Sequence, residues 1–200
     1  MKKPILILLP TLNRPQSLCD CISSFVINGS GLADIITLGG PGGITAVLNS
    51  VPMELIRQYE IVGSMGDDIR MRTKGWDLMV CDRLLDKIGM IHGRDGIQDS
   101  KLPTHPFIST PIIAALGFIQ PAELKHFYGD NFYQELLGPL GLIQYVPELF
   151  TEHLHFTIGL SPKDSTYEAG YRHWDADGAA WEQYRQRQLP TMIARVRGLL

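Results

Sequence analysis

The 200-residue sequence predicts an α/β protein with a mixed, mostly parallel central sheet and a helical extension at its C-terminus. Short apolar runs alternate with segments of helical periodicity in the first half, which is the pattern of strands joined by crossover helices. The apolar run at residues 61–65 ends in two adjacent carboxylates, Asp67 and Asp68. In open α/β sheets, ligands bind beyond the carboxyl ends of the strands. Beyond residue 140 strand signals follow one another, which predicts that the sheet becomes mixed.

The composition is that of one globular domain with a small appendage. Hydrophobic residues make up 44% of the chain and charged residues 20%, with a formal net charge of −3. This charge excludes a global basic surface for nucleic acid, so a polyanionic partner would need a local patch. Three cysteines without a framework spacing indicate a reduced environment. No apolar run approaches the roughly 18 residues of a membrane span, so we expect a soluble, cytoplasmic protein with no membrane partner.

Six apolar segments predict the strands of the sheet, because runs without polar residues are typical of strands covered on both faces. The segments are residues 5–9, 35–38, 61–65, 90–92, 142–146 and 149–156. The first of them follows two lysines, as a signal peptide would. It lasts only five residues before Pro10 and has no small-residue cleavage site, which favours a strand.

Cap and stop residues delimit the predicted helices. Asn13 can cap the first helix, Pro15 suits its first turn, and Gly29 follows its last turn. Further helices are predicted at residues 52–59, 76–88, 112–116 and 130–137. Residues 93–104 form a polar loop between two of these segments.

The last forty residues differ from the rest of the chain. They begin as a polar stretch and end in a basic amphipathic helix that Pro190 interrupts. The apolar positions of this helix include Trp181, Tyr184, Ile193 and Val196. We therefore expect a main domain at residues 1–160 and a C-terminal loop and amphipathic helix at residues 161–200 that pack on it.

The turn after the first strand is a candidate anion site. Residues 9–15 read LPTLNRP and connect a strand to a helix N-terminus, where free backbone N–H groups and the helix dipole favour an anion. Arg14 adds a cation. The alternative is a simple helix cap with a surface arginine.

Four glycines occur among residues 39–43, after the second predicted strand. This run is not a dinucleotide-binding fingerprint, because Pro41 interrupts it and no helix is predicted to begin there. We expect a flexible loop that allows a close backbone approach.

The adjacent carboxylates Asp67 and Asp68 repel each other unless a cation or a polar ligand lies between them. Such oxygen ligands suit Mg²⁺ or Mn²⁺, which commonly bridge substrate phosphates. The alternative is a solvated turn, since aspartate is a frequent turn residue.

His153 and His155 alternate along a predicted strand, so both side chains would lie on one face. Two imidazoles on one face could complete a metal site with a distant carboxylate. The alternative is a pair of ordinary hydrogen-bonded histidines.

Asp130 begins a predicted helix directly after Gly129. A carboxylate at this position can cap the helix. The helix dipole favours its charged form, so Asp130 could equally act as a base that is ionised at neutral pH.

Together these motifs resemble a known family. The opening LPTLNRP resembles that of family 2 glycosyltransferases of the GT-A fold, and residues 66–68 (GDD) are similar to their metal and nucleotide motif. Residues 129–132 (GDNF) and 152–155 (EHLH) resemble the positions of a catalytic carboxylate and a late metal-ligating histidine. The ordered set is most similar to small bacteriophage glycosyltransferases, some of which modify hydroxymethylpyrimidines in DNA. The resemblance covers residues 5–164.

The resemblance implies a GT-A-like domain, a hexosyl transfer with inversion, and a nucleotide-diphosphate sugar donor, UDP being the favoured nucleotide. The donor would be bound by Pro10, Thr11, Asn13, Arg14, Gly39, Gly40 and Asp67. Mn²⁺ or Mg²⁺ would be held by Asp68, His153 and His155.

For the acceptor the resemblance implies 5-hydroxymethylcytosine, or another hydroxymethylpyrimidine, in double-stranded DNA. A phage protein of this kind would act in the host cytoplasm. Asp130 would be the catalytic base, and Trp76, Asp95 and Asn131 would contact the acceptor. A core tryptophan at position 76 is an equal alternative.

Two departures from the family pattern stand out. Glycines occupy residues 39 and 40, where the family commonly has acidic residues, and Gly66 replaces the first aspartate of the acidic triplet. The alternative functions are a glycosyltransferase with a small-molecule, glycan or protein acceptor, a nucleotidyltransferase, and a non-catalytic nucleotide-sugar or glycan-binding module.

Overall fold

A seven-stranded sheet forms the centre of the computed structural model, which describes residues 3–200. Its strands lie in the order β2-β1-β3-β6-β5-β7-β4. The strands are β1 (Lys3–Pro10), β2 (Ala33–Leu38), β3 (Tyr59–Ser64), β4 (Ile69–Met71), β5 (Met90–Arg94), β6 (Phe107–Ser109) and β7 (Ile143–His153). The pairings make β1, β2, β3, β5 and β7 run in one direction and β4 and β6 in the other. The predicted α/β class with a mixed, mostly parallel sheet is confirmed.

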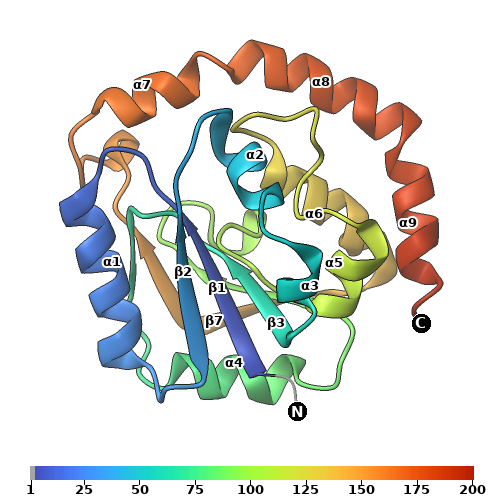
Figure 1. The fold of residues 1–200 in the computed structure, drawn as a ribbon, viewed down its shortest axis with the longest axis horizontal. Coiled ribbons are helices and arrows are strands. Elements are labelled where there is room, and N and C mark those ends of the chain that lie inside the picture. The colour runs from blue at the N-terminus through green and yellow to red at the C-terminus, as the bar shows by residue number, and fades with distance from the viewer. Residues whose placement is uncertain (1–2) are drawn as a thin grey trace.

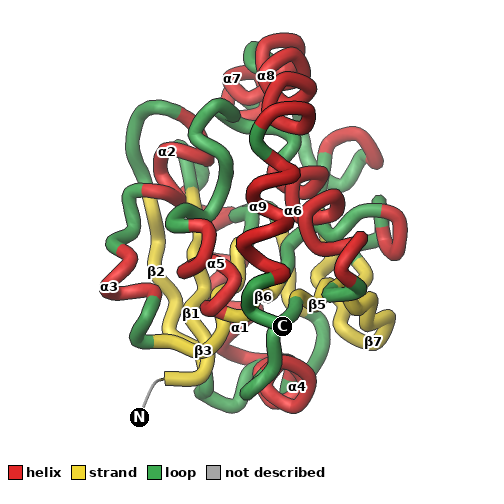
Figure 2. The backbone as a smooth tube through the Cα atoms, turned by 90° about the vertical axis from the view of Figure 1, so that its right-hand side faces the viewer, coloured by secondary structure: helices red, strands yellow, loops and turns green. Residues whose placement is uncertain are grey.

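The helices cover both faces and one end of the sheet (Figure 1). Helices α7, α8 and α9 form a continuous arc along the edge of the molecule, and the view in Figure 2 shows α7 and α8 beyond one end of the strands. The helices are α1 (Pro15–Asn28), α2 (Gly43–Asn49), α3 (Met53–Ile56), α4 (Trp76–Leu84), α5 (Thr110–Leu116), α6 (Gly129–Leu137), α7 (Ser165–Tyr171), α8 (Trp174–Arg187) and α9 (Leu189–Arg197). Among residues 3–200, no helix is long and apolar enough to cross a membrane.

Strand β1 is apolar throughout because each of its faces contributes to a separate core. Leu6 and Leu8 belong to one core, which α5, α6, α8 and α9 complete. Ile5, Ile7 and Leu9 belong to the other, which α1 and α4 complete. All five side chains are fully buried, as expected from the alternation of side chains along a strand. This strand therefore holds the turn that follows it firmly in place.

Several element boundaries differ from the prediction. Only α3 forms within residues 52–59, and Tyr59 already belongs to β3, where it is buried. The two strands predicted at 142–146 and 149–156 are one strand, β7, with an irregularity opposite Gly93 and Arg94. A helix, α2, begins at Gly43, where none was predicted, because Gly42 and Gly43 adopt positive φ angles. Strands β4 and β6 have three residues each, too few for a periodic signal.

The C-terminal region contains three helices instead of the single interrupted helix that was predicted. Pro190 lies in the first turn of α9, so it starts a new helix instead of kinking an existing one. Trp181 and Tyr184 of α8 pack edge-on against Phe132 of α6, with ring centroids 6.5 and 5.9 Å away. The C-terminal helices thus share a core with the body of the fold.

Gly93 offers a test of the close packing between β5 and β7. A Cβ atom at this position would lie 2.0 Å from the carbonyl oxygen of Leu149, a backbone atom that no side-chain movement can displace. We expect Gly93→Ala to destabilise the protein by about 1–3 kcal/mol or more. Denaturant unfolding measures this loss. Gly138→Ala is the matched control, since its Cβ would meet only ordinary contacts at 3.9 Å, and an equal loss in both variants would contradict the prediction.

Candidate active site

The turn after β1 brings Thr11 and Arg14 close to Asp67 at the edge of the sheet. All three are predicted site residues. The backbone N–H of Thr11 donates to Leu38 at the end of β2, at 2.9 Å, and its hydroxyl donates to Asp67 at 2.7 Å. Arg14 occupies the cap position of α1. Asn13 does not cap this helix as predicted, because it adopts a left-handed conformation with φ 56° one residue earlier.

Arg14 is the central cation of the site. Its guanidinium donates to both oxygens of Asp164, at 2.7 and 2.8 Å, and lies 3.2 Å from Asp67 and 3.5 Å from Asp68. Its guanidinium carbon also lies 3.9 Å from the ring centroid of Tyr167. Burial acts to lower the pKa of Arg14, but the surrounding carboxylates outweigh it and raise the pKa, so the charge is permanent. Arg14 thereby supplies the cation that the adjacent carboxylates require.

The two adjacent carboxylates have opposite electrostatic environments. Burial is the largest influence on Asp67 and raises its pKa. Burial also acts to raise the pKa of Asp68, but His153, His105 and the hydroxyl of Tyr167 outweigh it and hold the pKa well below its usual range. The Tyr167 hydroxyl donates to Asp68 at 2.8 Å. Asp68 is therefore the carboxylate that stays ionised under all ordinary conditions.

His153, at the end of β7, lies between two carboxylates. Its Nε2 is 3.5 Å from Asp68 Oδ2, and its Nδ1 is 3.8 Å from Asp95 Oδ2. Burial acts to lower the pKa of His153, but the two carboxylates outweigh it and raise the pKa to about 9. His153 is therefore an imidazolium at neutral pH unless a metal ion replaces its proton.

A second histidine that the sequence did not indicate completes this cluster. His105, in the loop before β6, has an edge-to-face contact with His153, with ring centroids 4.8 Å apart. Burial and the charge of His153 lower its pKa to about 4. One ligand atom each from Asp95, His105 and His153 lies within 4.8 Å of the others, and two buried ring nitrogens there, His105 Nε2 and His153 Nδ1, have no hydrogen-bond partner. The ligand atoms of this cluster lie close enough together to hold a metal ion.

His155, the other predicted ligand, lies beside His153 but outside that cluster. The ring centroids of the two histidines are 5.1 Å apart. The Nδ1 of His155 pairs with the hydroxyl of Thr157 at 2.8 Å, because β7 ends at His153 and the chain turns into a short 3₁₀ helix. The strand alternation that would have aligned the two imidazoles stops between them.

Asp95, predicted to contact the acceptor, is instead an internal anchor. It is 1% exposed, and its Oδ1 accepts the backbone N–H groups of the three residues 97–99. Its Oδ2 accepts the hydroxyl of Thr104 at 2.9 Å. Both oxygens thus hold the 95–104 loop, and the remaining contact faces His153. This arrangement suits a residue that orients an imidazole.

Asp130 lies in the first turn of α6, where its environment differs from the predicted one. The cap position belongs to Tyr128, and no side chain caps this helix. Burial is the largest influence on Asp130 and raises its pKa to about 7, although the charge of His153 acts in the opposite direction. The predicted full ionisation at neutral pH is therefore wrong, since burial outweighs the helix dipole. A carboxyl group with this pKa is suited to proton transfer near pH 7.

The two remaining acceptor candidates lie in different surroundings. Trp76 is 1% exposed, packs edge-on against Phe25, and donates its indole N–H to the Phe25 carbonyl. Trp76 is therefore a core residue and not an acceptor contact, because it begins α4 on the side that faces the sheet. Asn131 follows Asp130 in the first turn of α6 and is partly exposed.

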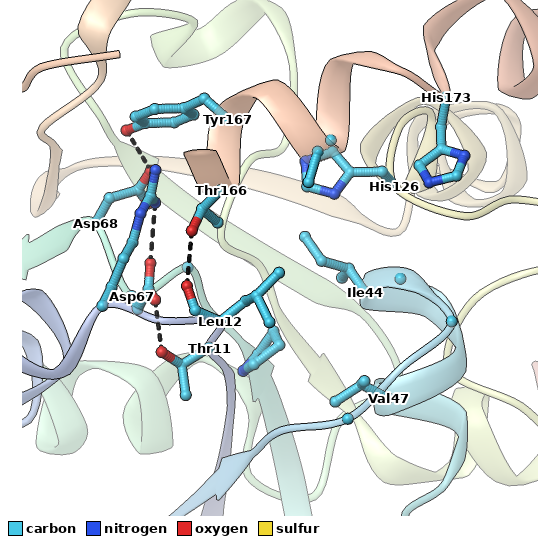
Figure 3. A pocket seen from close by; sticks show the side chains of 18 of the residues that line it. Thr11, Leu12, Ile44, Val47, Asp67, Asp68, His126, Thr166, Tyr167 and His173 are labelled. Carbon is cyan, nitrogen blue, oxygen red and sulfur yellow. Dashed lines mark hydrogen bonds and ion pairs between the residues drawn. The ribbon is translucent and has the colours of Figure 1, made fainter. Parts of the chain in front are cut away.

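A cavity of about 280 Å³ lies between the turn after β1, the turn before α2 and helix α7. Figure 3 shows Asp67 and Asp68 at one end of it and His126 and His173 at the other. Its apolar wall comes from α2, and Pro10, Thr11, Arg14 and Gly40 also line it. Gly39 is exposed beside these lining residues. The cavity thus joins a charged end to an apolar middle, as sites for charged, ring-containing ligands do.

Segment 164–167 contributes Thr166 and Tyr167 to the cavity wall, a role that the sequence hardly indicates. Besides the Arg14–Asp164 and Tyr167–Asp68 contacts, the hydroxyl of Thr166 donates to the Leu12 carbonyl at 2.7 Å. The available signal was a helix start, because Asp164 caps α7 by accepting the N–H groups of Thr166 and Tyr167. That signal predicts a helix but does not predict which turn it covers.

Asp177 of α8 fixes the loop that leads to Asp130, and it offers a second test. This 1% exposed carboxylate accepts the backbone N–H groups of Lys125, His126 and Phe127 at 2.8–3.0 Å. In Asp177→Asn an amide NH₂ would face at least one of these donors. We expect a loss on the order of 3 kcal/mol in unfolding free energy. Asp175→Asn, an exposed neighbour, is the control and should leave stability within about 0.5 kcal/mol, as surface changes do.

The sequence matches no protein-family model and no curated protein. Solved structures resemble the fold. The mannosyltransferase PcManGT from Pyrobaculum calidifontis, in complex with GDP-mannose and Mn²⁺, superposes with a TM-score of 0.60 at 11% identity, over 99% of this chain and 74% of that one.

Two further structures resemble the fold of this chain with similar TM-scores. Glucosyl-3-phosphoglycerate synthase from Mycobacterium tuberculosis, in complex with Mn²⁺, UDP and glucosyl-3-phosphoglycerate, has a TM-score of 0.56 at 15% identity, over 89% of this chain and 80% of that one. Residues 1–349 of TarS from S. aureus give 0.53 at 11% identity, over 76% of this chain and 59% of that one. The fold of this chain is therefore the GT-A-like fold of these structures.

Proposed function

We propose that this protein is a metal-dependent glycosyltransferase that moves a sugar from a nucleotide-diphosphate sugar, with UDP the favoured nucleotide, to a hydroxyl acceptor. The observation that carries the proposal is the meeting of Arg14 and Asp68 at one end of an apolar-walled cavity in a GT-A-like fold, with His153 3.5 Å from Asp68. The structural neighbours crystallised with GDP-mannose or UDP and Mn²⁺ support it, as does the motif resemblance.

The donor fits the cavity by its chemistry. Arg14 offers a cationic contact to a diphosphate, and the N-terminus of α1, which no side chain caps, offers a dipolar one. We assign the donor to Pro10, Thr11, Asn13, Arg14, Gly39, Gly40 and Asp67. Arg14 donates to Asp164, so a diphosphate would share or replace that carboxylate.

The carboxylate and imidazole groups of the site also fit a divalent cation such as Mn²⁺. Asp68 supplies an ionised carboxylate and His153 an imidazole 3.5 Å away, and the unpartnered ring nitrogens of His105 and His153 lie close by. We assign the metal to Asp68 and His153, with His105 and Asp95 adjacent and His155 outside. A bound cation would neutralise the charge that develops on the leaving diphosphate.

Asp130 is the proposed general base. Its carboxyl group has a pKa of about 7, which burial raises and on which the charges of His153 and Asp95 act in opposite directions. It would take the proton of the acceptor hydroxyl as that oxygen attacks the anomeric carbon and the diphosphate leaves, which gives inversion at this carbon.

For the acceptor we propose 5-hydroxymethylcytosine, or another hydroxymethylpyrimidine, in DNA, on the strength of the motif resemblance to phage enzymes. Two basic residues in and directly after β4 contribute little to such binding, because Arg72 pairs with Glu152 at 2.7 Å and Arg70 with Asp20 at 3.2 Å. DNA would therefore have to approach by another surface.

A single assay tests the function. The protein is incubated with Mn²⁺, UDP- and GDP-sugars, and DNA that contains either 5-hydroxymethylcytosine or cytosine, and nucleosides are analysed by mass spectrometry. We expect one hexose on hydroxymethylcytosine alone, and no product after chelation of the metal. Glycan, peptide and small-molecule acceptors form parallel arms, and product there would reassign the acceptor. Failure to bind any nucleotide or to release nucleoside diphosphate would refute the transferase itself.

A further inference from the structure

Four aromatic rings form a continuous cluster where α7 meets α8, outside the cavity described above. Tyr171 and Trp174 are nearly parallel, with an interplanar angle of 13° and centroids 6.1 Å apart. Phe127 contacts both rings, at 5.3 and 4.7 Å, and Phe156 contacts Tyr171 at 5.7 Å. We call these four residues the aromatic platform.

The aromatic platform is exposed to solvent, unlike the side chains of a hydrophobic core. Tyr171 is 39% and Trp174 47% exposed, although large aromatic side chains gain most from burial. The Phe127 and Phe156 rings are only half-buried beneath them. Because Asp177 fixes the backbone of residues 125–127, the platform is also rigidly supported from below. Rigid, exposed, adjacent rings are the chemistry of a stacking surface.

The position of the platform connects it to the proposed reaction. His173 lines the donor cavity (Figure 3), and Trp174 is the next residue along the chain. Phe127 lies three residues before Asp130 and Phe156 three residues after His153. The two segments that carry the proposed base and metal ligand therefore also carry the two lower rings.

The cations beside the aromatic platform indicate what kind of ligand ring would stack on it. The ammonium group of Lys163 lies 5.7 Å from the centroid of Phe156 and 5.9 Å from that of Tyr171. Arg172 is exposed between the two stacked residues. Cations at the edge of an aromatic surface complement a ligand that carries both a flat ring and phosphate, and a neutral glycan needs no such charge.

We propose that the aromatic platform binds an unpaired nucleobase of the DNA acceptor. The inference rests on the proposed function and names the surface by which DNA reaches it. Enzymes that act on a base in a duplex take it out of the stack, so a surface that receives an extruded or neighbouring base is required. Trp174 and Tyr171 provide the stacking faces, and Lys163 contacts the phosphate backbone.

The test measures binding without turnover. A short single-stranded oligothymidylate that carries one 5-hydroxymethylcytosine is titrated by fluorescence anisotropy at fixed salt. Trp174→Ala should weaken binding about 5- to 150-fold, which corresponds to about 1–3 kcal/mol for one stacked base. Trp174→Phe keeps a stacking ring and should recover most of the affinity. Ile27→Ala, at an exposed apolar site on α1, is the control and should bind as the parent does.

The outcomes separate the platform from the proposed function. No binding of the oligonucleotide by the parent, or equal binding by Trp174→Ala, overturns the platform. Loss of affinity for maltohexaose in Trp174→Ala, with DNA affinity unchanged, reassigns the platform to glycans and also overturns it. UDP and Mn²⁺ binding is measured by calorimetry in the same variants and should not change. Its absence in the parent would refute the donor site while leaving a positive platform result intact.

Discussion

Asp130→Asn should lower sugar transfer by about 10²–10⁴-fold, because an amide cannot accept the proton of the attacking hydroxyl. Donor and Mn²⁺ binding should stay near normal, since Asp130 is not among the described residues that line the donor cavity. Initial rates and calorimetry measure the two quantities separately. In the parent, the rate should rise with pH through about 7, where Asp130 loses its proton, and the variant should lack this limb.

The same substitution should stabilise the protein at high pH, which a structural role would not produce. The pKa of Asp130 is raised from 3.8 to about 7 by burial, so between these values the folded state binds more protons than the unfolded state. Its contribution to stability therefore falls as pH rises through that range. We expect Asp130→Asn to gain up to roughly 4 kcal/mol at pH 8 and little at pH 4.

Transfer within a few fold of the parent would contradict the role of Asp130. Glu135→Gln, on the same helix and partly exposed, is the matched control and should change neither rate nor the pH dependence of stability. If Asp130→Asn loses stability at pH 8, the carboxylate has a structural partner and the assignment as a base is wrong.

Asp68→Asn should abolish most metal-dependent transfer, by on the order of 10³-fold, because a cation at this site supplies several kcal/mol of charge stabilisation. Mn²⁺ affinity should fall in parallel. The pKa of His153 should also fall from about 9, since one of the two carboxylates that raise it is removed. Mn²⁺ titration and NMR of the imidazole protons measure these effects.

The neighbouring carboxylate provides the control for Asp68. Asp67→Asn removes the carboxylate that pairs with Thr11 and Arg14. It leaves Asp68, the carboxylate that faces His153. We expect Asp67→Asn to weaken donor binding and to keep Mn²⁺ affinity near that of the parent. Loss of Mn²⁺ binding in Asp67→Asn with retention in Asp68→Asn would reverse the assignment.

Regular topology accounts for the meeting of Arg14 with Asp67 and Asp68. Parallel neighbouring strands end at the same edge, so the turns after β1 and β3 must lie together. The pairing of His153 with Asp68 is implied by the family resemblance, and the structure has its Nε2 3.5 Å from Asp68.

The missed features depend on burial and on contacts between distant segments. A sequence shows that Asp130 starts a helix, but not that the surrounding fold buries it enough to raise its pKa to about 7. Trp76 begins an amphipathic helix, and only packing shows that its ring faces Phe25. No motif marks Tyr167 of α7 or His105 of the loop before β6, and both reach the site through contacts between distant segments.

The contacts of segment 164–167 have a consequence for the order of folding. Arg14 and Asp164 are 150 residues apart in the chain, and Leu12 and Thr166 are 154 apart. Contacts of such high sequence separation form late, because closing a long loop must precede them. A chain emerging from the ribosome can form β1, β2 and β3 long before α7 is synthesised. Donor affinity should therefore appear only once the chain has extended past α7 and the helices α8 and α9 have completed the core.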